Sequence, residues 1–378
     1  IPSGVAIAPV VLVTDNIYLG ANDHGDFKVT LTAADGRTRT ITEPATQDNA
    51  SGKSFGFAAL PELRASDGVY QLDVAVVDNA GQTETAAAAF MVNRFGSVYM
   101  FDSATQQMVE AANPLQDARD IAITEVNVSP LEEREVKTIH NGQDTKILSD
   151  SEVKVTEGSE HGWNTMTYSM PASLFEAEGT YEVRLWTKDA LGNVSQNDEP
   201  RDDAEDAPLI ECGDAQWATL IDGCAEGAAI SFRIDKTPPT ITVADLKEGG
   251  KYEVASLPVT FEVTDFFEDN IASVGVQVNG ADVPATNTGG DTWEVTVPNA
   301  FRSQSVVFTA VDKSGRESVR EIGDVLVTNN GWAIWFNNTP LFIGSIIGAA
   351  VAVFGAMWLI ILFRRRRRDG KERSGATA

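Results

Sequence analysis

Histidine and cysteine are scarce in this chain, which limits the chemistry that it can support. Of the 378 residues, three are histidines and two are cysteines. His24, His140 and His161 are scattered, and none lies in the His-Glu-x-x-His spacing that presents two zinc ligands on one helical face. The Gly-x-x-x-x-Gly-Lys-Ser/Thr loop that cradles phosphates is absent as well. We therefore predict that the chain is not an enzyme and that calcium is its only candidate cofactor.

Basic residues are few outside the C-terminus. The chain has 29 lysines and arginines against 55 aspartates and glutamates, and residues 1–363 hold 22 of the former and 53 of the latter. Such an acidic surface repels nucleic acid, which is therefore excluded as a partner. Solubility is one explanation of this charge, and specific cation binding is the alternative. The candidate calcium ligands lie near predicted strand ends or in an acidic run: Asp15, Asp265, Asp269, Asp202 and Asp203.

Long hydrophobic runs are also missing, with the exception of residues 341–363, which carry no charge. As a helix this run is roughly 34 Å long, enough to cross the ~30 Å hydrocarbon core of a bilayer. A buried core helix is disfavoured because such helices are shorter and keep a polar stripe. The run is followed by five arginines that set its orientation, because basic flanks stay in the cytoplasm: Arg364, Arg365, Arg366, Arg367 and Arg368.

These features predict a single-pass protein of the cell membrane. Residues 341–363 would lie in membrane lipid, residues 364–378 would form a short cytoplasmic tail, and the rest of the chain would be extracellular. Residues 329–340 would form a juxtamembrane stem. Within the span, Gly344, Gly348 and Ala352 share a small-residue face that favours helix dimerisation, although small residues are common in membrane helices anyway.

The two cysteines, Cys212 and Cys224, would lie on the oxidising side of the membrane. A disulfide is therefore expected there. A metal site is the weaker interpretation, because two thiols without a neighbouring histidine do not complete a tetrahedral shell. Closing this short loop would stabilise the fold by roughly 3 kcal/mol in the chain-entropy description.

One block of sequence occurs three times. In each copy a strand with alternating apolar residues, such as Val306, Phe308 and Ala310, runs into Asp-x-x-Gly. This spacing is typical of a type I turn in which glycine takes a positive φ, so the block predicts a β-hairpin. We expect these aspartates to form turns rather than to bind calcium. The turn-forming residues are Asp78 and Gly81, Asp189 and Gly192, and Asp312 and Gly315.

The repeat predicts three domains, at residues 1–94, 95–236 and 237–328. The first is expected to lack its initial strand, because Asp15 has 14 residues before it while Asp265 lies 26 residues after Pro239. We therefore expect a longer protein with further sequence upstream. The middle domain is expected to be larger because of an acidic insertion at about residues 198–229, which contains both cysteines. Loops at the ends of sandwiches often carry recognition.

The predicted domains resemble the tandem bacterial Ig-like domains of surface proteins. The resemblance rests on all-β units of this domain length, which close on Asp-x-x-Gly, and on the joining sequence Asp235-Lys236-Thr237-Pro238-Pro239. The resemblance implies an all-β fold, namely tandem Ig-like Greek-key β-sandwiches followed by one C-terminal transmembrane α-helix. It transfers no binding site. We expect adhesion or binding of an extracellular protein or glycan at exposed loops, and the alternative is a passive stalk for an upstream catalytic or receptor head.

Overall fold

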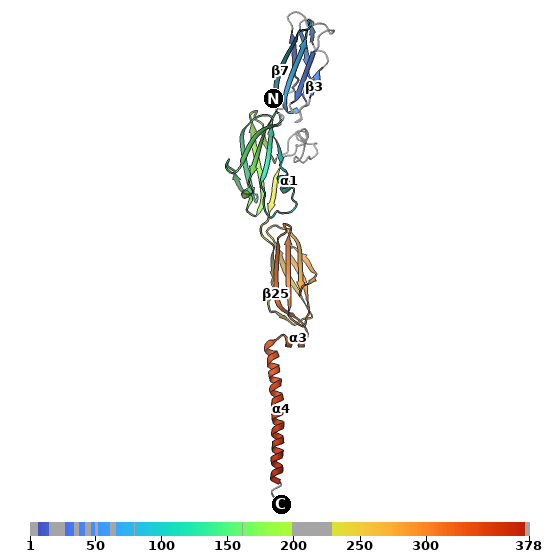
Figure 1. The fold of residues 1–378 in the computed structure, drawn as a ribbon, viewed down its shortest axis with the longest axis vertical. Helices are drawn as coiled ribbons and strands as arrows, with labels where there is room; N and C mark the ends of the chain where they lie inside the picture. Colours follow the sequence, from blue (N-terminus) through green and yellow to red (C-terminus); the bar gives the residue numbers. More distant parts are fainter. Residues whose placement is uncertain are drawn as a thin grey trace. The chain divides into compact units, whose positions relative to one another are not determined.

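The computed structural model is built from mainly antiparallel β-sheets, followed by a long C-terminal helix (Figure 1). It describes residues 7–14, 27–33, 38–41, 47–49, 52–60, 66–78, 80–160, 162–198 and 229–374. The chain forms two compact units, residues 1–236 and residues 237–378.

The first part of the first unit contains two sheets. One has the strand order β1-β5-β4 and the other β3-β2-β6-β7, and all pairs are antiparallel. Val29, Leu31, Phe55 and Tyr70 pack between them as a buried core. The strands are β1 (Val10–Thr14), β2 (Phe27–Ala33), β3 (Thr38–Ile41), β4 (Gln47–Asn49), β5 (Gly52–Gly56), β6 (Gly68–Val77) and β7 (Thr83–Val92).

The second part of this unit is a larger sandwich. One sheet has the order β12-β13-β9-β8, and the other has the order β11-β10-β14, with β15 and β16 both paired to β14. The core includes Tyr168, Phe175, Tyr181 and Phe232, whose rings pack partly edge to face. The strands are β8 (Val98–Phe101), β9 (Ile121–Asn127), β10 (Leu131–His140), β11 (Asp144–Ile147), β12 (Lys154–Glu160), β13 (Trp163–Met170), β14 (Gly179–Asp189), β15 (Val194–Gln196) and β16 (Ile230–Ile234).

Two short helices accompany this sandwich. Helix α1 (Ser103–Val109) begins after Asp102, whose side chain accepts a hydrogen bond from the Thr105 amide at 2.8 Å and so caps the helix. The 3₁₀ helix η2 (Ala172–Phe175) places Phe175 in the core.

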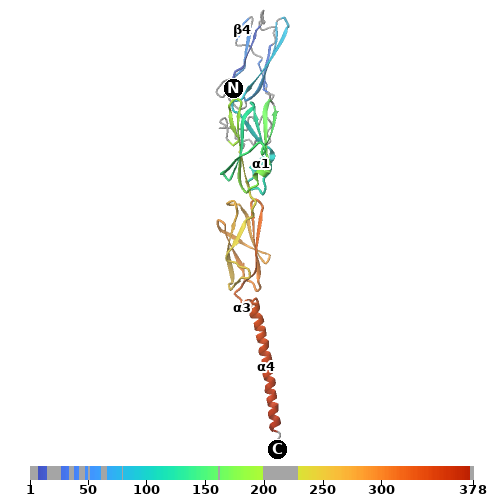
Figure 2. The ribbon, with the colours of Figure 1, turned by 90° about the vertical axis from the view of Figure 1, so that its left-hand side faces the viewer.

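The second unit contains one sandwich, whose strands lie in two layers (Figure 2). The sheets have the orders β17-β19-β23-β22 and β18-β25-β24-β20-β21. Phe261 and Phe308 meet edge to face in the core, with ring centroids 4.9 Å apart. The strands are β17 (Thr240–Val243), β18 (Lys251–Tyr252), β19 (Ser256–Thr264), β20 (Ile271–Val278), β21 (Ala281–Val283), β22 (Ala285–Gly289), β23 (Thr292–Pro298), β24 (Gln304–Asp312) and β25 (Glu317–Val327).

The strand order explains why the sequence repeats. When the short strands β18 and β21 are left out, the last sandwich follows the pattern of an Ig-like fold in chain order. The first, second, fourth and fifth strands (β17, β19, β22 and β23) share one sheet, and the third, sixth and seventh (β20, β24 and β25) share the other. The middle sandwich has the same order, with β8, β9 and β13 in the places of β17, β19 and β23. The predicted fold class, tandem Ig-like sandwiches followed by one apolar helix, is therefore confirmed.

Alternation along the strands creates these cores. In β24 every second residue from Gln304 to Asp312 is buried, and in β14 the same holds from Gly179 to Asp189. Because successive side chains of a strand point to opposite faces, the buried residues fill the space between the sheets.

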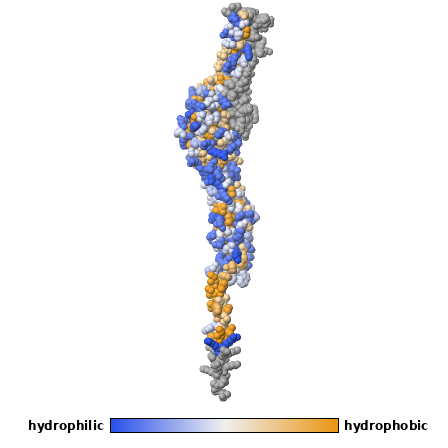
Figure 3. Space-filling model, viewed as in Figure 1, coloured by the Kyte–Doolittle hydropathy of each residue, from blue (hydrophilic) through white to orange (hydrophobic). Residues whose placement is uncertain are grey.

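The C-terminal part is helical. Helix α3 (Gly331–Phe336) is capped by Asn330, and helix α4 (Thr339–Ser374) follows. Residues Thr339–Arg365 of α4 have a mean hydropathy of 2.6 over their most apolar window, and none of that window is buried. This segment is thus long and apolar enough to cross a membrane, and hydrophobic residues cover most of it in the space-filling view (Figure 3).

Candidate functional site

The three Asp-x-x-Gly sequences form the same backbone turn. The amides of Gly81, Gly192 and Gly315 donate to the carbonyl groups of the aspartates three residues earlier, at 3.0, 2.9 and 3.2 Å. These glycines have φ values of +80°, +86° and +92°. Such values are strained for residues with a Cβ atom, which explains the glycine at the fourth position of each motif.

The side chain of each aspartate stabilises its own turn through one oxygen. Oδ1 of Asp78 accepts hydrogen bonds from the Ala80 and Gln82 amides, and Oδ1 of Asp189 accepts from those of Leu191 and Asn193. In the last sandwich, Oδ1 of Asp312 accepts from the Arg316 amide at 2.8 Å and from the Ser314 hydroxyl at 2.7 Å. The turn therefore leaves the second oxygen of each carboxylate available for another role.

In the middle sandwich, asparagine side chains surround this second oxygen. Asp189 is 1% exposed, and its Oδ2 accepts hydrogen bonds from the amide groups of Asn93 at 2.7 Å, Asn193 at 2.9 Å and Asn127 at 3.3 Å. Asn127 is buried too, and its Oδ1 accepts from Asn93 at 2.9 Å and from the Ser129 amide at 2.8 Å. The buried charge is thus stabilised by neutral donors.

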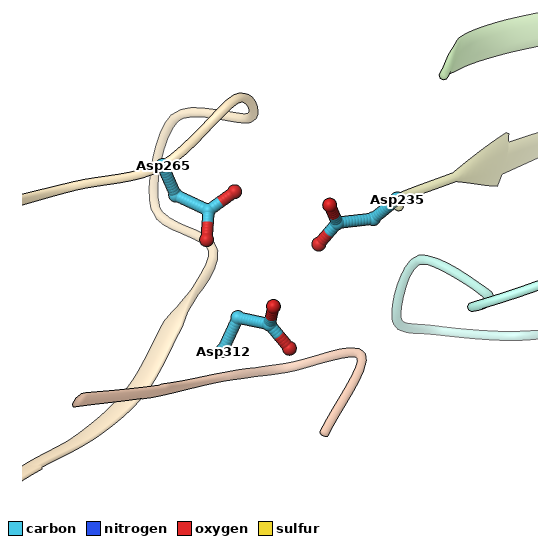
Figure 4. A group of neighbouring side chains, drawn as sticks. All are labelled: Asp235, Asp265 and Asp312. Atoms are coloured by element: carbon cyan, nitrogen blue, oxygen red, sulfur yellow. The ribbon is translucent and has the colours of Figure 1, made fainter. Parts of the chain in front are cut away.

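In the last sandwich, a second carboxylate stands near the equivalent oxygen. Asp312 is also 1% exposed, but its Oδ2 has no hydrogen-bond partner. A carboxylate oxygen of Asp265 lies within 4.8 Å of one from Asp312, and the two groups point into the same space (Figure 4). Oδ2 of Asp265 is buried without a hydrogen-bond partner as well, while its Oδ1 accepts from the Asn270 amide group at 3.2 Å.

The electrostatics of this pair differ from those at Asp189. Burial, and to a smaller degree the charge of Asp312, raise the pKa of the Asp265 carboxyl above its ordinary value, although hydrogen bonds from Asn270 and from the backbone oppose the shift. Among the described residues, no ion pair involves Asp265 or Asp312. Lys313 is exposed and lines an adjoining hollow of about 580 Å³ together with Asp265, Asp269 and Asn270.

Of the remaining predicted cation ligands, Asp269 lies in the described part of the structure and lines the same hollow as Asp265. Asp269 is exposed in the loop after β19, with a φ of +56°. Asp15, Asp202 and Asp203 lie outside the described residues, as do Cys212 and Cys224, so both the acidic run and the disulfide stay predictions. Asp312 was expected only as a turn residue, and Asn93 and Asn127 were not expected at all.

A sequence signal for the pair exists nevertheless. Asn127 ends β9, Asp265 directly follows β19, and these two strands occupy the same place in their sandwiches. The comparison of Val126-Asn127 with Thr264-Asp265 therefore identifies an amide-to-carboxylate exchange beside an unchanged turn aspartate.

A further buried carboxylate lies in the middle sandwich. Glu125 is 1% exposed and accepts hydrogen bonds from the hydroxyls of Tyr168 at 2.8 Å, Thr187 at 2.6 Å and Ser97. Burial raises the pKa of Glu125, against the lowering effect of these hydroxyls. Because hydroxyl donors satisfy both oxygens, this group stabilises the core rather than forming an open site.

One stretch matches the letters of a hydrolase motif. Gly52-Lys53-Ser54-Phe55-Gly56 has the Gly-x-Ser-x-Gly pattern. That motif places its serine on a strained turn between a strand and a helix. Here the five residues form β5, which pairs with β1 and β4, so the local geometry of the motif is missing.

Comparisons with known proteins show no family. No family model matches the sequence, and no curated protein matches it. Solved structures with a similar arrangement include a tetra-tandem repeat from the extending region of a large adhesion protein (15% identity, 84% of this chain and 74% of that one, TM-score 0.29). Others are invasin, a bacterial integrin-binding protein (11%, 85% and 60%, 0.28), and extracellular cadherin domains 1–4 of protocadherin gamma B7 (13%, 83% and 66%, 0.26). At these TM-scores the similarity carries no argument about function.

Proposed function

We propose that the chain is a cell-surface protein anchored by α4, and that its sandwiches project from the membrane for adhesion or ligand binding. The observation that carries this proposal is the apolar segment Thr339–Arg365, which has no protein cover. Soluble proteins rarely leave contiguous apolar patches of more than a few hundred Å² in water. A bilayer supplies the missing apolar environment.

The flanks of α4 support the proposed orientation. Arg364 and Arg365 are exposed directly after the apolar segment, and basic residues favour the cytoplasmic side. Before the segment, Trp332 is 73% exposed, as expected for an aromatic ring of the outer headgroup layer. We propose three extracellular domains with the boundaries 1–94, 95–236 and 237–328. Dimerisation through Gly344, Gly348 and Ala352 stays a prediction.

A specific observation favours the second candidate, a passive spacer. The two sandwiches of the first unit are joined by a packed contact, because Val69 of the first lies against the cluster of Val98, Val126, Val128 and Trp163 in the second. Oδ2 of Asp67 also accepts from the Arg94 and Phe95 amides, at 3.0 and 3.1 Å. A packed joint of this kind favours the spacer, because a spacer needs neighbouring sandwiches to be held together and adhesion does not.

Two measurements test the proposal. If the full chain is expressed in cells, alkaline carbonate should leave it in the membrane fraction, and protease added outside intact cells should digest the sandwiches. Release of the chain by carbonate would refute the membrane anchoring. Protection of the sandwiches from protease until the cells are lysed would refute the orientation.

Adhesion is tested separately from anchoring. Cells that display the full chain are compared with cells that display residues 237–378 for attachment to one another and to immobilised glycans and matrix proteins. Stronger attachment by the full chain supports a binding role, whereas equal attachment favours the spacer.

A further inference from the structure

We propose that Asp265 and Asp312 bind a hard divalent cation, calcium, at the end of the last sandwich. The proposal is independent of membrane anchoring and of any adhesive ligand. It concerns the pair of carboxylates labelled Asp265 and Asp312 in Figure 4.

The first argument is the missing counter-charge. Asp312 is 1% exposed, its Oδ2 has no hydrogen-bond partner, and one of its carboxylate oxygens lies within 4.8 Å of one from Asp265. A buried charge is tolerated when it is paired, hydrogen-bonded or coordinated to a metal. The described residues provide neither an ion pair nor a hydrogen bond for this oxygen, and a cation would supply the charge that is missing.

The second argument is the contrast within the chain. The middle sandwich has the same turn, with the same role for Oδ1 of Asp189, but its Oδ2 accepts from three amide groups, including that of Asn127. In the last sandwich the residue in the place of Asn127 is Asp265, which cannot donate when ionised. The same turn therefore places Asp189 among neutral hydrogen-bond donors in the middle sandwich, whereas in the last sandwich it places Asp312 near an acceptor, the carboxylate of Asp265.

The third argument is the chemistry of the ligands. Carboxylate oxygens are hard donors, and calcium takes six to eight oxygen ligands in a flexible geometry that includes water and carbonyl groups. The pair provides two carboxylates, and the adjoining hollow of about 580 Å³ beside Asp265 leaves room for water ligands. Thiol and imidazole groups, which softer metals prefer, are absent from the residues that line this hollow.

The alternative is a proton in place of the cation. Two carboxylates at short distance can share one proton, and the pKa of Asp265 is raised. In that case calcium would have no effect near neutral pH, which makes the two explanations distinguishable.

The test uses the full chain in detergent, stripped with EDTA and transferred to chelator-free buffer. Calcium chloride is titrated by isothermal calorimetry into wild type, Asp265→Asn and Asp312→Asn. The matched control is Asp282→Asn, which removes the same charge from an exposed side chain that accepts a hydrogen bond from Gln277. We expect each of the two cluster variants to bind calcium at least tenfold more weakly at this site, and the control to bind as wild type does.

A second readout does not need the metal. Without calcium, Asp265→Asn should melt at a higher temperature than wild type, because it removes the repulsion and offers an amide donor to Asp312, as Asn127 does for Asp189. Calcium should then raise the melting temperature of wild type but not of this variant. Wild type that responds to calcium no more than to potassium chloride of equal ionic strength, or an Asp265→Asn variant with an unchanged isotherm, would overturn the proposal.

Discussion

Asn127→Asp tests the difference between the two sandwiches directly, because it converts the neutral arrangement into the acidic one. The change is nearly isosteric, so it creates no cavity. Nδ2 of Asn127 donates to the Ser97 hydroxyl at 2.9 Å and to Asp189 Oδ2 at 3.3 Å. The variant loses both donors and places a second buried carboxylate beside Asp189.

The expected magnitude follows from these contacts. A hydrogen bond to a charged group contributes about 1.5–3 kcal/mol, and an uncompensated buried charge costs about 3–5 kcal/mol. We therefore expect the unfolding free energy to fall by about 3–5 kcal/mol near neutral pH without calcium. For a unit of this size each kcal/mol shifts the melting temperature by roughly 2–4 °C, so the expected shift is roughly 6–20 °C.

Scanning calorimetry of the full chain in detergent measures this shift for the first unit. Gln143→Glu is the control, because it adds the same charge at an exposed turn position. It should change the melting temperature of the first unit by less than about 2 °C, since exposed substitutions usually stay within about 0.5 kcal/mol. A loss of less than 1 kcal/mol for Asn127→Asp would refute the reasoning, because the amide would then not be what stabilises Asp189.

Three further predictions follow from buried and exposed groups elsewhere. Burial raises the pKa of Glu125 above its value in the unfolded chain. The unfolding free energy should therefore fall as the pH rises from about 4.5, the ordinary pKa, through the raised value. Urea denaturation should show that Glu125→Gln reduces this fall. Phe308→Ala should lower the unfolding free energy by about 3–5 kcal/mol in the same assay, because Phe308 is fully buried against Phe261. In vesicles, brominated lipids should quench a larger fraction of the tryptophan fluorescence in wild type than in Trp332→Phe. Equal quenching of the two proteins would place Trp332 away from the headgroups.

The sequence was sufficient for the fold class because the strands alternate strictly. Val306, Phe308 and Ala310 are all 0% exposed, as the period of two requires. Two elements without a long alternating pattern were not predicted. Helix α1 has seven residues and only a side-chain cap at Asp102 as its signal, and the parallel pairing of β18 with β25 joins residues far apart in sequence.

The candidate site was only half predictable for a similar reason. Asp265 follows a strand and was recognised as a potential ligand, whereas Asp312 lies in a turn motif that already explains its presence. Nothing in the spacing of 47 residues between them indicates contact. Their proximity follows from the topology, since β19 and β24 lie in opposite sheets and both end at this edge of the sandwich.

A turn aspartate constrains what can surround it. One oxygen is committed to the turn amides, so the other is held at the end of the sandwich whatever the neighbouring side chains are. At Asp189 the neighbours are amides, and the buried charge is stabilised permanently by the protein itself. At Asp312 the neighbour is Asp265, and no described residue donates a hydrogen bond to the second oxygen, which is where we propose that a cation binds. Exchanging one amide for a carboxylate thus changes a constitutive structural element into one whose stability can follow the cation content of the surrounding solution.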